Sequence, residues 1–270
     1  MDLKEQALQI ARQTPDSREA RNRLREYLQH VILREIFELN GGRFLVFHGG
    51  TALRIVHGLR RFSEDLDFHT STGTERDKVR TIMEKIPKRL HRNGYALTVK
   101  SDLTKTVHSM ELRFEELLQE TGLSVHSNQK LNVKIEIDTT PPVGFGTSRS
   151  IINTYFPFAL LHHDQPTFLA GKINAVLTRA YSKGRDYYDL FFYLSRWKEI
   201  LPNFPFLKAA LLQANYHGEE MAAGNWKQVL LQHIQLQKMD DIRKDLSPFI
   251  ENPAEMDLIT LDNFRNLLTS

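Results

Sequence analysis

Cysteine is absent from this chain of 270 residues, so disulfide bonds cannot contribute to its stability. Long apolar runs are absent as well, because no stretch approaches the roughly 18 apolar residues of a membrane-spanning helix. The N-terminal residues lack the apolar region of a signal peptide, and no repeat or low-complexity tract is found. These absences lead us to expect a cytoplasmic protein with no membrane association.

A large excess of charge of one sign is also missing. The chain has 36 Lys and Arg residues against 33 Asp and Glu residues, which gives a formal net charge of +3. This balance is too mild to identify a nucleic-acid partner by itself. The length is sufficient to bury a substantial core in one or two domains.

The distribution of apolar residues divides the chain into two parts of different character. Residues 2–40 have helical periodicity, and short apolar or alternating runs then predict strands separated by helices. The predicted strands are residues 44–47, 65–68, 95–100, 107–114, 132–138 and 151–155, and the predicted helices are residues 51–59 and 75–93. From about residue 157 only helical periods follow, at residues 168–181, 185–197, 206–215, 226–239 and 262–268. We therefore predict an α/β domain with an N-terminal helical segment over residues 1–156 and a helical domain over residues 157–270.

A glycine pair followed by two alternate carboxylates is the most informative local feature. Gly49 and Gly50 lie between a predicted strand and a predicted helix, where free backbone N–H groups can bind an anion such as phosphate. Asp65 and Asp67 occupy alternate positions of the next strand, so both carboxylates project from the same face. Paired carboxylates repel unless a cation lies between them, and Mg²⁺ characteristically binds carboxylate and phosphate oxygens. The alternatives are an ordinary tight turn capped by Thr51 and a solvated strand face.

A third carboxylate is predicted on a neighbouring strand. In residues 132–138 the alternation places Lys134, Glu136 and Asp138 on one face and two isoleucines on the other. Glu136 is the centre of that polar face, where a carboxylate can bind a metal ion or accept the proton of an attacking hydroxyl. The alternative is a half-exposed strand edge, and Asp138 is expected to be structural.

Charged residues also interrupt two apolar helices of the second part. Lys172 lies on an otherwise apolar helix, and Asp186 and Asp189 lie one turn apart near the start of the next helix. Burial of an unpartnered lysine is costly, so Lys172 is expected to contact phosphate or carboxylate. The alternatives are that Lys172 extends to solvent and that Asp186 only complements the helix N-terminus.

The order of these segments resembles the AbiEii/AbiGii family of nucleotidyltransferase toxins, which are DNA-polymerase-β-like enzymes. The shared segments are Gly-Gly-Thr-Ala-Leu-Arg, Ser-x-Asp-Leu-Asp-Phe, Lys-Ile-Glu-Ile, Lys-x-x-Ala-x-x-x-Arg and Arg-Asp-x-x-Asp-Leu, and residues 240–249 resemble the C-terminal region of that family. Two positions depart from the family pattern. Gly171 replaces the acidic or small polar residue that usually precedes the lysine, and Gly-Gly replaces the Gly-Ser of many nucleotidyltransferases. The resemblance implies an α+β fold in which a nucleotidyltransferase-like mixed sheet flanked by helices precedes an all-α region that completes the active site.

The resemblance also implies roles for individual residues. Asp65 and Asp67 would bind Mg²⁺, with Mn²⁺ as an alternative ion and Glu136 as the third carboxylate. Lys172 matches the lysine that contacts the nucleotide phosphates, and Asp186 matches the acidic residue of the Arg-Asp-x-x-Asp-Leu segment. The residues expected to bind the nucleotide, besides Lys172, are Gly49, Gly50, Thr51, Arg54 and Ser63.

The function implied by the resemblance is transfer of a nucleoside monophosphate from an NTP to an RNA, with the 3′ end of tRNA as the preferred acceptor. Such a toxin blocks translation and is neutralised by a cognate antitoxin protein encoded nearby. Two other functions stay open at this point. One is nucleotidyl or phosphoryl transfer to a protein or small-molecule hydroxyl, and the other is a non-catalytic binding module on the same fold.

Overall fold

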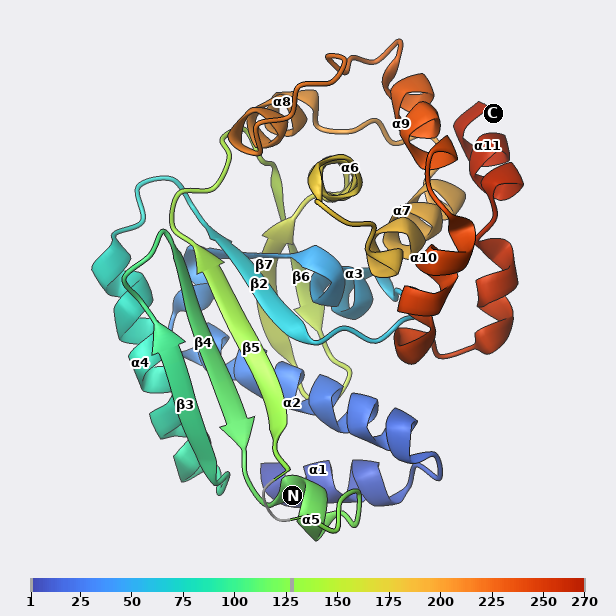
Figure 1. Ribbon diagram of the computed structural model, residues 1–270. Coiled ribbons are helices and arrows are strands. Elements are labelled where there is room, and N and C mark those ends of the chain that lie inside the picture. Colours follow the sequence, from blue (N-terminus) through green and yellow to red (C-terminus); the bar gives the residue numbers. More distant parts are fainter. Residues whose placement is uncertain (1, 127–128, 270) are drawn as a thin grey trace. The chain divides into compact units, whose positions relative to one another are not determined.

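The structure is a computed structural model that describes residues 2–126 and 129–269 (Figure 1). It divides into two compact units. The first unit comprises residues 1–52, 62–141 and 149–162, and the second comprises residues 53–61, 142–148 and 163–270. The predicted boundary near residue 157 stays a prediction.

The described residues form one seven-stranded mixed sheet with the order β3-β4-β5-β2-β1-β7-β6. Its strands are β1 (Leu45–His48), β2 (Asp65–Thr70), β3 (Leu97–Asp102), β4 (Val107–Phe114), β5 (Leu131–Asp138), β6 (Thr147–Ile152) and β7 (Phe158–His163). The pairs β1–β2, β3–β4 and β4–β5 are antiparallel, whereas β2–β5 and β1–β7 are parallel. The mixed sheet confirms the predicted fold class.

Helices account for most of the remaining described residues. They are α1 (Leu3–Arg12), α2 (Ser17–Glu38), α3 (Gly49–His57), α4 (Arg76–Arg92), α5 (Leu117–Glu120), α6 (Gln165–Thr178), α7 (Gly184–Arg196), α8 (Phe204–Gln213), α9 (Trp226–Gln235), α10 (Met239–Leu246) and α11 (Leu261–Thr269). Three short 3-10 helices are η1 (Gly41–Arg43), η2 (Ser247–Phe249) and η3 (Pro253–Leu258). Asp2, Asp16, Asp164 and Asn203 cap the first turns of α1, α2, α6 and α8 through side-chain oxygens that accept backbone N–H groups.

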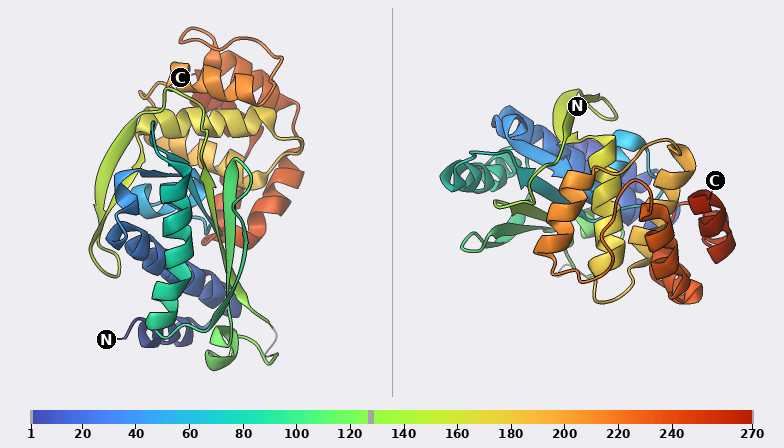
Figure 2. Two further views of the ribbon diagram at one scale, coloured as in Figure 1. Left: turned by 90° about the vertical axis from the view of Figure 1, so that its left-hand side faces the viewer. Right: turned by 90° about the horizontal axis from the view of Figure 1, so that it is seen from above.

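Alternation along the central strands gives the sheet one apolar and one polar face. In β5 the residues at positions 131, 133, 135 and 137 are buried, and the residues between them are half-buried or exposed. The apolar face packs against helices, because α2 contacts β5 and α4 contacts β3 (Figures 1 and 2). The other face carries the charged side chains of β2 and β5. The period of two therefore places the core on one side and the candidate catalytic residues on the other.

The second unit is built mainly from helices. α6 packs against α7, α8 and α9, and α7 also packs against α10 and α11 (Figure 1). Close contact between α7 and α10 depends on Gly184, because a Cβ there would lie 2.1 Å from the Ile242 carbonyl oxygen. The Gly184 N–H also donates to the Asp245 carboxylate at 2.8 Å, so α10 supplies the partner that the first turn of α7 lacks locally.

The strand predicted at residues 151–155 lies earlier in the chain, as β6 (Thr147–Ile152). Two further sequence expectations were wrong. A strand does follow residue 157, since Phe158–His163 forms β7 beside β1. The sequence Phe-Ala-Leu-Leu-His-His is buried on both sides of the strand and therefore lacks the alternation that marks a half-exposed strand. In addition, α3 begins at Gly49 rather than after the glycine pair, and Gly49 has a φ of +79°.

Candidate active site

Asp65 and Asp67 lie on the polar face of β2, directly opposite the polar positions of β5. The Cα partners across the parallel pair are Asp65 with Lys134 and Asp67 with Glu136. All four side chains are half-buried. Register therefore brings three carboxylates to one face of two neighbouring strands, as the alternation in the sequence predicted.

Lys134 is the cation that this acidic face already contains. Its Nζ lies 2.7 Å from Glu136 Oε1. The hydrogen bond to Glu136 is the main cause of the raised pKa of Lys134, and the charges of Asp65 and Asp67 raise this pKa further. The negative potential here thus favours a bound positive charge.

The glycine turn approaches this carboxylate pair closely. A Cβ at Gly49 would lie 2.5 Å from Asp67 Oδ2, so a side chain at this position would have to displace the Asp67 carboxylate. Thr51 is fully buried, and its hydroxyl donates to the main-chain carbonyl of Asp65. The start of α3 is therefore fixed against the strand that carries both aspartates, which holds the turn next to the Asp67 carboxylate.

A buried ion network surrounds Lys172 in the second unit. Lys172 is 8% exposed, and its Nζ lies 2.6 Å from Asp189 Oδ2 and 3.3 Å from Asp186 Oδ1. Asp189 is fully buried and accepts two hydrogen bonds of 2.6 Å from Arg61. Arg179 Nε lies 2.8 Å from the second Asp186 oxygen. Lys172 thus has carboxylate partners, as the cost of burying it required.

The charge of Asp189 is set by two opposing effects. Complete burial raises the pKa of its carboxyl, but the positive charges and hydrogen bonds of Arg61 and Lys172 outweigh burial and hold the pKa below its ordinary value. Asp189 is therefore an anion that orients Lys172 from inside the helical core.

Comparison with known proteins identifies the family. The family model described as nucleotidyl transferase AbiEii toxin, type IV toxin–antitoxin system, matches residues 31–269. The chain belongs to the AbiEii family. It is therefore a nucleotidyltransferase toxin, and a toxin of a type IV system has an antitoxin as its partner. This membership confirms the family resemblance and the enzyme class predicted from the sequence.

One solved structure supports the fold of this AbiEii chain, and a second is reported beside it. A proposed nucleotidyltransferase from H. pylori has a TM-score of 0.50 and 20% sequence identity, with 89% of this chain and 93% of that chain covered. JHP933 from Helicobacter pylori has a TM-score of 0.45 and 18% identity, with 89% and 94% covered. A comparison with curated proteins gave no significant match. Among the described residues, no helix is long and apolar enough to cross a membrane.

The remaining predicted nucleotide-binding residues of the AbiEii chain have structural contacts. Arg54 Nη2 lies 2.8 Å from Glu251 Oε1, and its side chain is 8% exposed. The main-chain carbonyl of Ser63 accepts from the Gln29 amide at 3.0 Å. Whether Arg54, Ser63 and Thr51 also contact nucleotide stays a prediction.

Two histidines beside the aspartates were missed by sequence reasoning. His48 lies opposite Asp67 in the antiparallel pair of β1 and β2, and its ring centroid is 3.9 Å from that of His69. Burial first, and the neighbouring His48 second, lower the pKa of His69 well below its ordinary value. The signal was present, because His69 follows Asp67 by two residues and shares its face.

The acidic face fits a divalent ion for which the protein supplies only some of the ligands. In the chain as described, no group of three or more His, Cys, Asp or Glu side chains is gathered for metal binding. Asp65 and Asp67 nevertheless offer the two carboxylates that Mg²⁺ commonly takes together with phosphate oxygens and water. Glu136 is held by Lys134, so its role as a third ligand stays a prediction.

Proposed function

We propose that this AbiEii toxin transfers a nucleoside monophosphate from an NTP to the 3′ end of an RNA, with tRNA as the acceptor. The observation that carries the proposal is the register of β2 against β5, which lines up Asp65 and Asp67 with Lys134 and Glu136 beside the Gly49 turn. Nucleotidyltransferases of this kind use an NTP and divalent metal ions.

Mg²⁺ is the proposed ion, and Mn²⁺ is an alternative with the same oxygen preference. Asp65 and Asp67 would hold it, and Glu136 would join them after release from Lys134. When bound, such an ion polarises phosphate oxygens and neutralises charge that develops during transfer. The protein's contribution is a fixed pair of carboxylates on a rigid strand.

The reaction is in-line attack of the acceptor hydroxyl on the α-phosphate of the NTP, with pyrophosphate as the leaving group. Backbone N–H groups at Gly49 and Gly50 are proposed to bind the triphosphate at the start of α3. Lys172 and Asp186 have the roles that their family segments imply, with Lys172 contacting nucleotide phosphates. The support in this structure is that Lys172 is restrained by Asp186 and Asp189, which fixes its ammonium group.

The proposed acceptor and its consequence for the cell rest on the family resemblance. Transfer to the 3′ end of tRNA would block its aminoacylation and therefore translation. Phosphate contacts by surface Lys and Arg residues would bind the RNA backbone. The antitoxin partner is proposed to be a protein encoded nearby.

A transfer assay tests the proposal. Purified protein is incubated with Mg²⁺, each α-labelled NTP in turn and total tRNA, and the mass of the labelled RNA is measured. The expected product gains one nucleoside monophosphate unit, and the Asp65→Ala, Asp67→Ala double variant gives none. The matched control is Asp138→Ala, which removes a carboxylate from the same face of β5 and should retain labelling. Full labelling by the double variant contradicts the proposal, and a gain of one phosphate would indicate phosphoryl transfer instead.

A further inference from the structure

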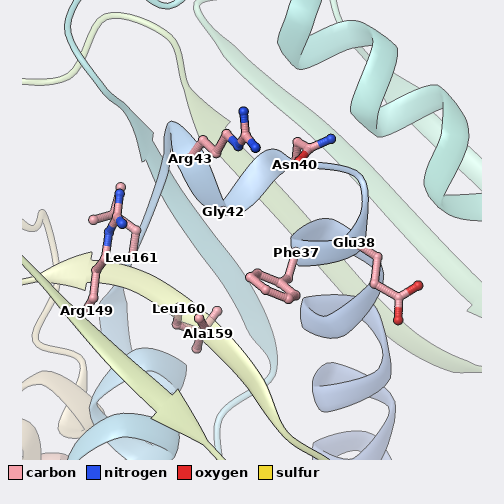
Figure 3. Close-up of a pocket in the computed structure, with 9 residues that line it drawn as sticks. All are labelled: Phe37, Glu38, Asn40, Gly42, Arg43, Arg149, Ala159, Leu160 and Leu161. Atoms are coloured by element: carbon pink, nitrogen blue, oxygen red, sulfur yellow. The ribbon is translucent and has the colours of Figure 1, made fainter.

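A pocket of about 400 Å³ lies in the first unit, at the end of β1 opposite to the glycine turn (Figure 3). Its residues come from the end of α2, from the turn that follows α2, from η1, from β6 and from β7: Phe37, Glu38, Asn40, Gly42, Arg43, Arg149, Ala159, Leu160 and Leu161. η1 precedes β1 and Gly49 follows it, so the four residues of β1, roughly 13 Å of strand, separate this pocket from the Gly49 turn. It is therefore distinct from the candidate active site, and a volume of this size accommodates a small ligand.

The pocket has an uncompensated positive charge. Arg43 and Arg149 are both exposed, and neither forms an ion pair with any described residue. The carboxylate among the lining residues is Glu38, which is already bound to Arg34 at 2.9 Å and to Arg89. The two guanidinium groups are thus available for an anion, and guanidinium is the side chain that best matches phosphate geometry.

An aromatic ring and an apolar floor accompany this charge. Phe37 is 41% exposed. Figure 3 shows its ring directed toward Ala159 and Leu160, whereas Glu38 points away from them. One side of the Phe37 ring packs on Gly42, where a Cβ would lie 3.2 Å from Phe37 Cδ2. The Asn40 amide also lines the pocket and offers both a donor and an acceptor.

We infer that this pocket binds one unpaired nucleotide, with the base on Phe37 and the phosphate between Arg43 and Arg149. Every nucleobase has a face that can stack on an aromatic ring, so Phe37 would accept bases without strong preference. The Asn40 amide can bond to the edge of the base. The same unit can come from single-stranded RNA or from a free nucleoside monophosphate. Binding here does not depend on the proposed transfer reaction.

Equilibrium binding to the full chain tests this site. Fluorescence anisotropy with a labelled single-stranded oligouridylate is measured as a function of salt, and unlabelled AMP is added as competitor. The Arg43→Ala, Arg149→Ala double variant should raise Kd about tenfold and lower the slope of log K against log salt by about 0.7, because the contact to one phosphate is lost. Phe37→Ala should raise Kd roughly tenfold with the slope unchanged. Arg80→Ala, which removes an exposed arginine of α4 outside the pocket, is the charge-matched control and should bind like wild type.

Crosslinking locates the bound base independently. RNA carrying 4-thiouridine should crosslink to the tryptic peptide Glu35–Arg43, which contains Phe37 and Asn40. The Asp65→Asn, Asp67→Asn variant should retain this crosslink, so failure of the proposed transfer function would leave the result intact. If AMP displaces the RNA, the site also binds free nucleotide. If AMP does not displace the RNA, the site is specific for RNA. Unchanged Kd in all pocket variants overturns the inference, and so does displacement by an acidic peptide but not by AMP, which would indicate a protein partner.

Discussion

Arg61 and Asp189 form a fully buried bidentate ion pair between residues 128 positions apart, with both N–O distances at 2.6 Å. Because Lys172 shares the same carboxylate, loss of the Asp189 charge would leave two buried cations without their main partner. We predict that Asp189→Asn lowers the free energy of unfolding by about 3–5 kcal/mol. Urea denaturation followed by circular dichroism measures this change.

An exposed pair provides the control for that measurement. Asp262 lies 2.9 Å from Arg265, and its side chain is 83% exposed. Asp262→Asn should therefore change the free energy of unfolding by less than about 1 kcal/mol. Equal losses in the two variants would show that the buried network has no special stabilising role.

The Asp189 carboxylate should also make the stability of the protein depend on pH. Its pKa in the folded protein is held below the ordinary value by Arg61 and Lys172, against the effect of burial. A lowered folded pKa means that the stabilisation is complete above the pKa of the unfolded chain, about 4, and is lost as pH falls through the folded pKa. The difference in urea midpoint between wild type and Asp189→Asn should therefore be constant from pH 7 to 5 and decrease below pH 4. A difference that grows in acid would contradict this sign.

Alanine variants at Gly49 and Gly58 distinguish the effect of backbone strain from the effect of a steric clash at the active site. Both have positive φ values, +79° and +73°, but a Cβ at Gly58 meets nothing within 4 Å, whereas one at Gly49 meets Asp67. Each alanine variant should lose roughly 1 kcal/mol of stability through its backbone conformation. Only Gly49→Ala should also displace the Asp67 carboxylate and reduce nucleotidyl transfer by roughly 100-fold. Comparable kcat/KM values for the two variants would remove Gly49 from the proposed site.

The contact between α7 and α10 gives a stability prediction. A Cβ at Gly184 would lie 2.1 Å from the Ile242 carbonyl oxygen and 2.9 Å from the Leu246 nitrogen, both of which are main-chain atoms that cannot rotate away. Gly184→Ala should cost about 2–3 kcal/mol, since α10 has to shift. Gly224→Ala, with open space around the added Cβ, is the control. Thermal unfolding of both variants is the measurement. An unchanged Tm for Gly184→Ala would mean that α10 can shift without loss of stability.

Periodicity was sufficient to predict the acidic face because its information is local. Alternation alone placed Asp65 and Asp67 together, and the same rule placed Lys134 with Glu136 on the neighbouring strand. Pairing of those two strands is a long-range property, yet the strand ladder confirms that the polar faces coincide. His69 obeyed the same rule and was overlooked, although it is two residues beyond Asp67.

Contacts between distant segments could not be predicted from these patterns. Arg61 lies in a loop with no periodic signal, and its partnership with Asp189 depends on how the chain returns to α7. The role of Gly184 depends in the same way on α10. The sequence of α10 was noted only because it resembles the C-terminal region of the family. β7 was missed because a strand buried on both faces reads as a continuous apolar run.

Binding of a divalent ion by Asp65 and Asp67 is the central claim, and Mn²⁺ titration followed by electron paramagnetic resonance tests it most directly. Metal-free protein is titrated in the presence of a non-hydrolysable NTP analogue, and the signal of free Mn²⁺ reports how many ions are bound. The wild type should bind at least one ion that the Asp65→Asn, Asp67→Asn variant does not, with the circular dichroism spectrum unchanged. Equal Mn²⁺ binding by the two folded proteins would contradict the claim.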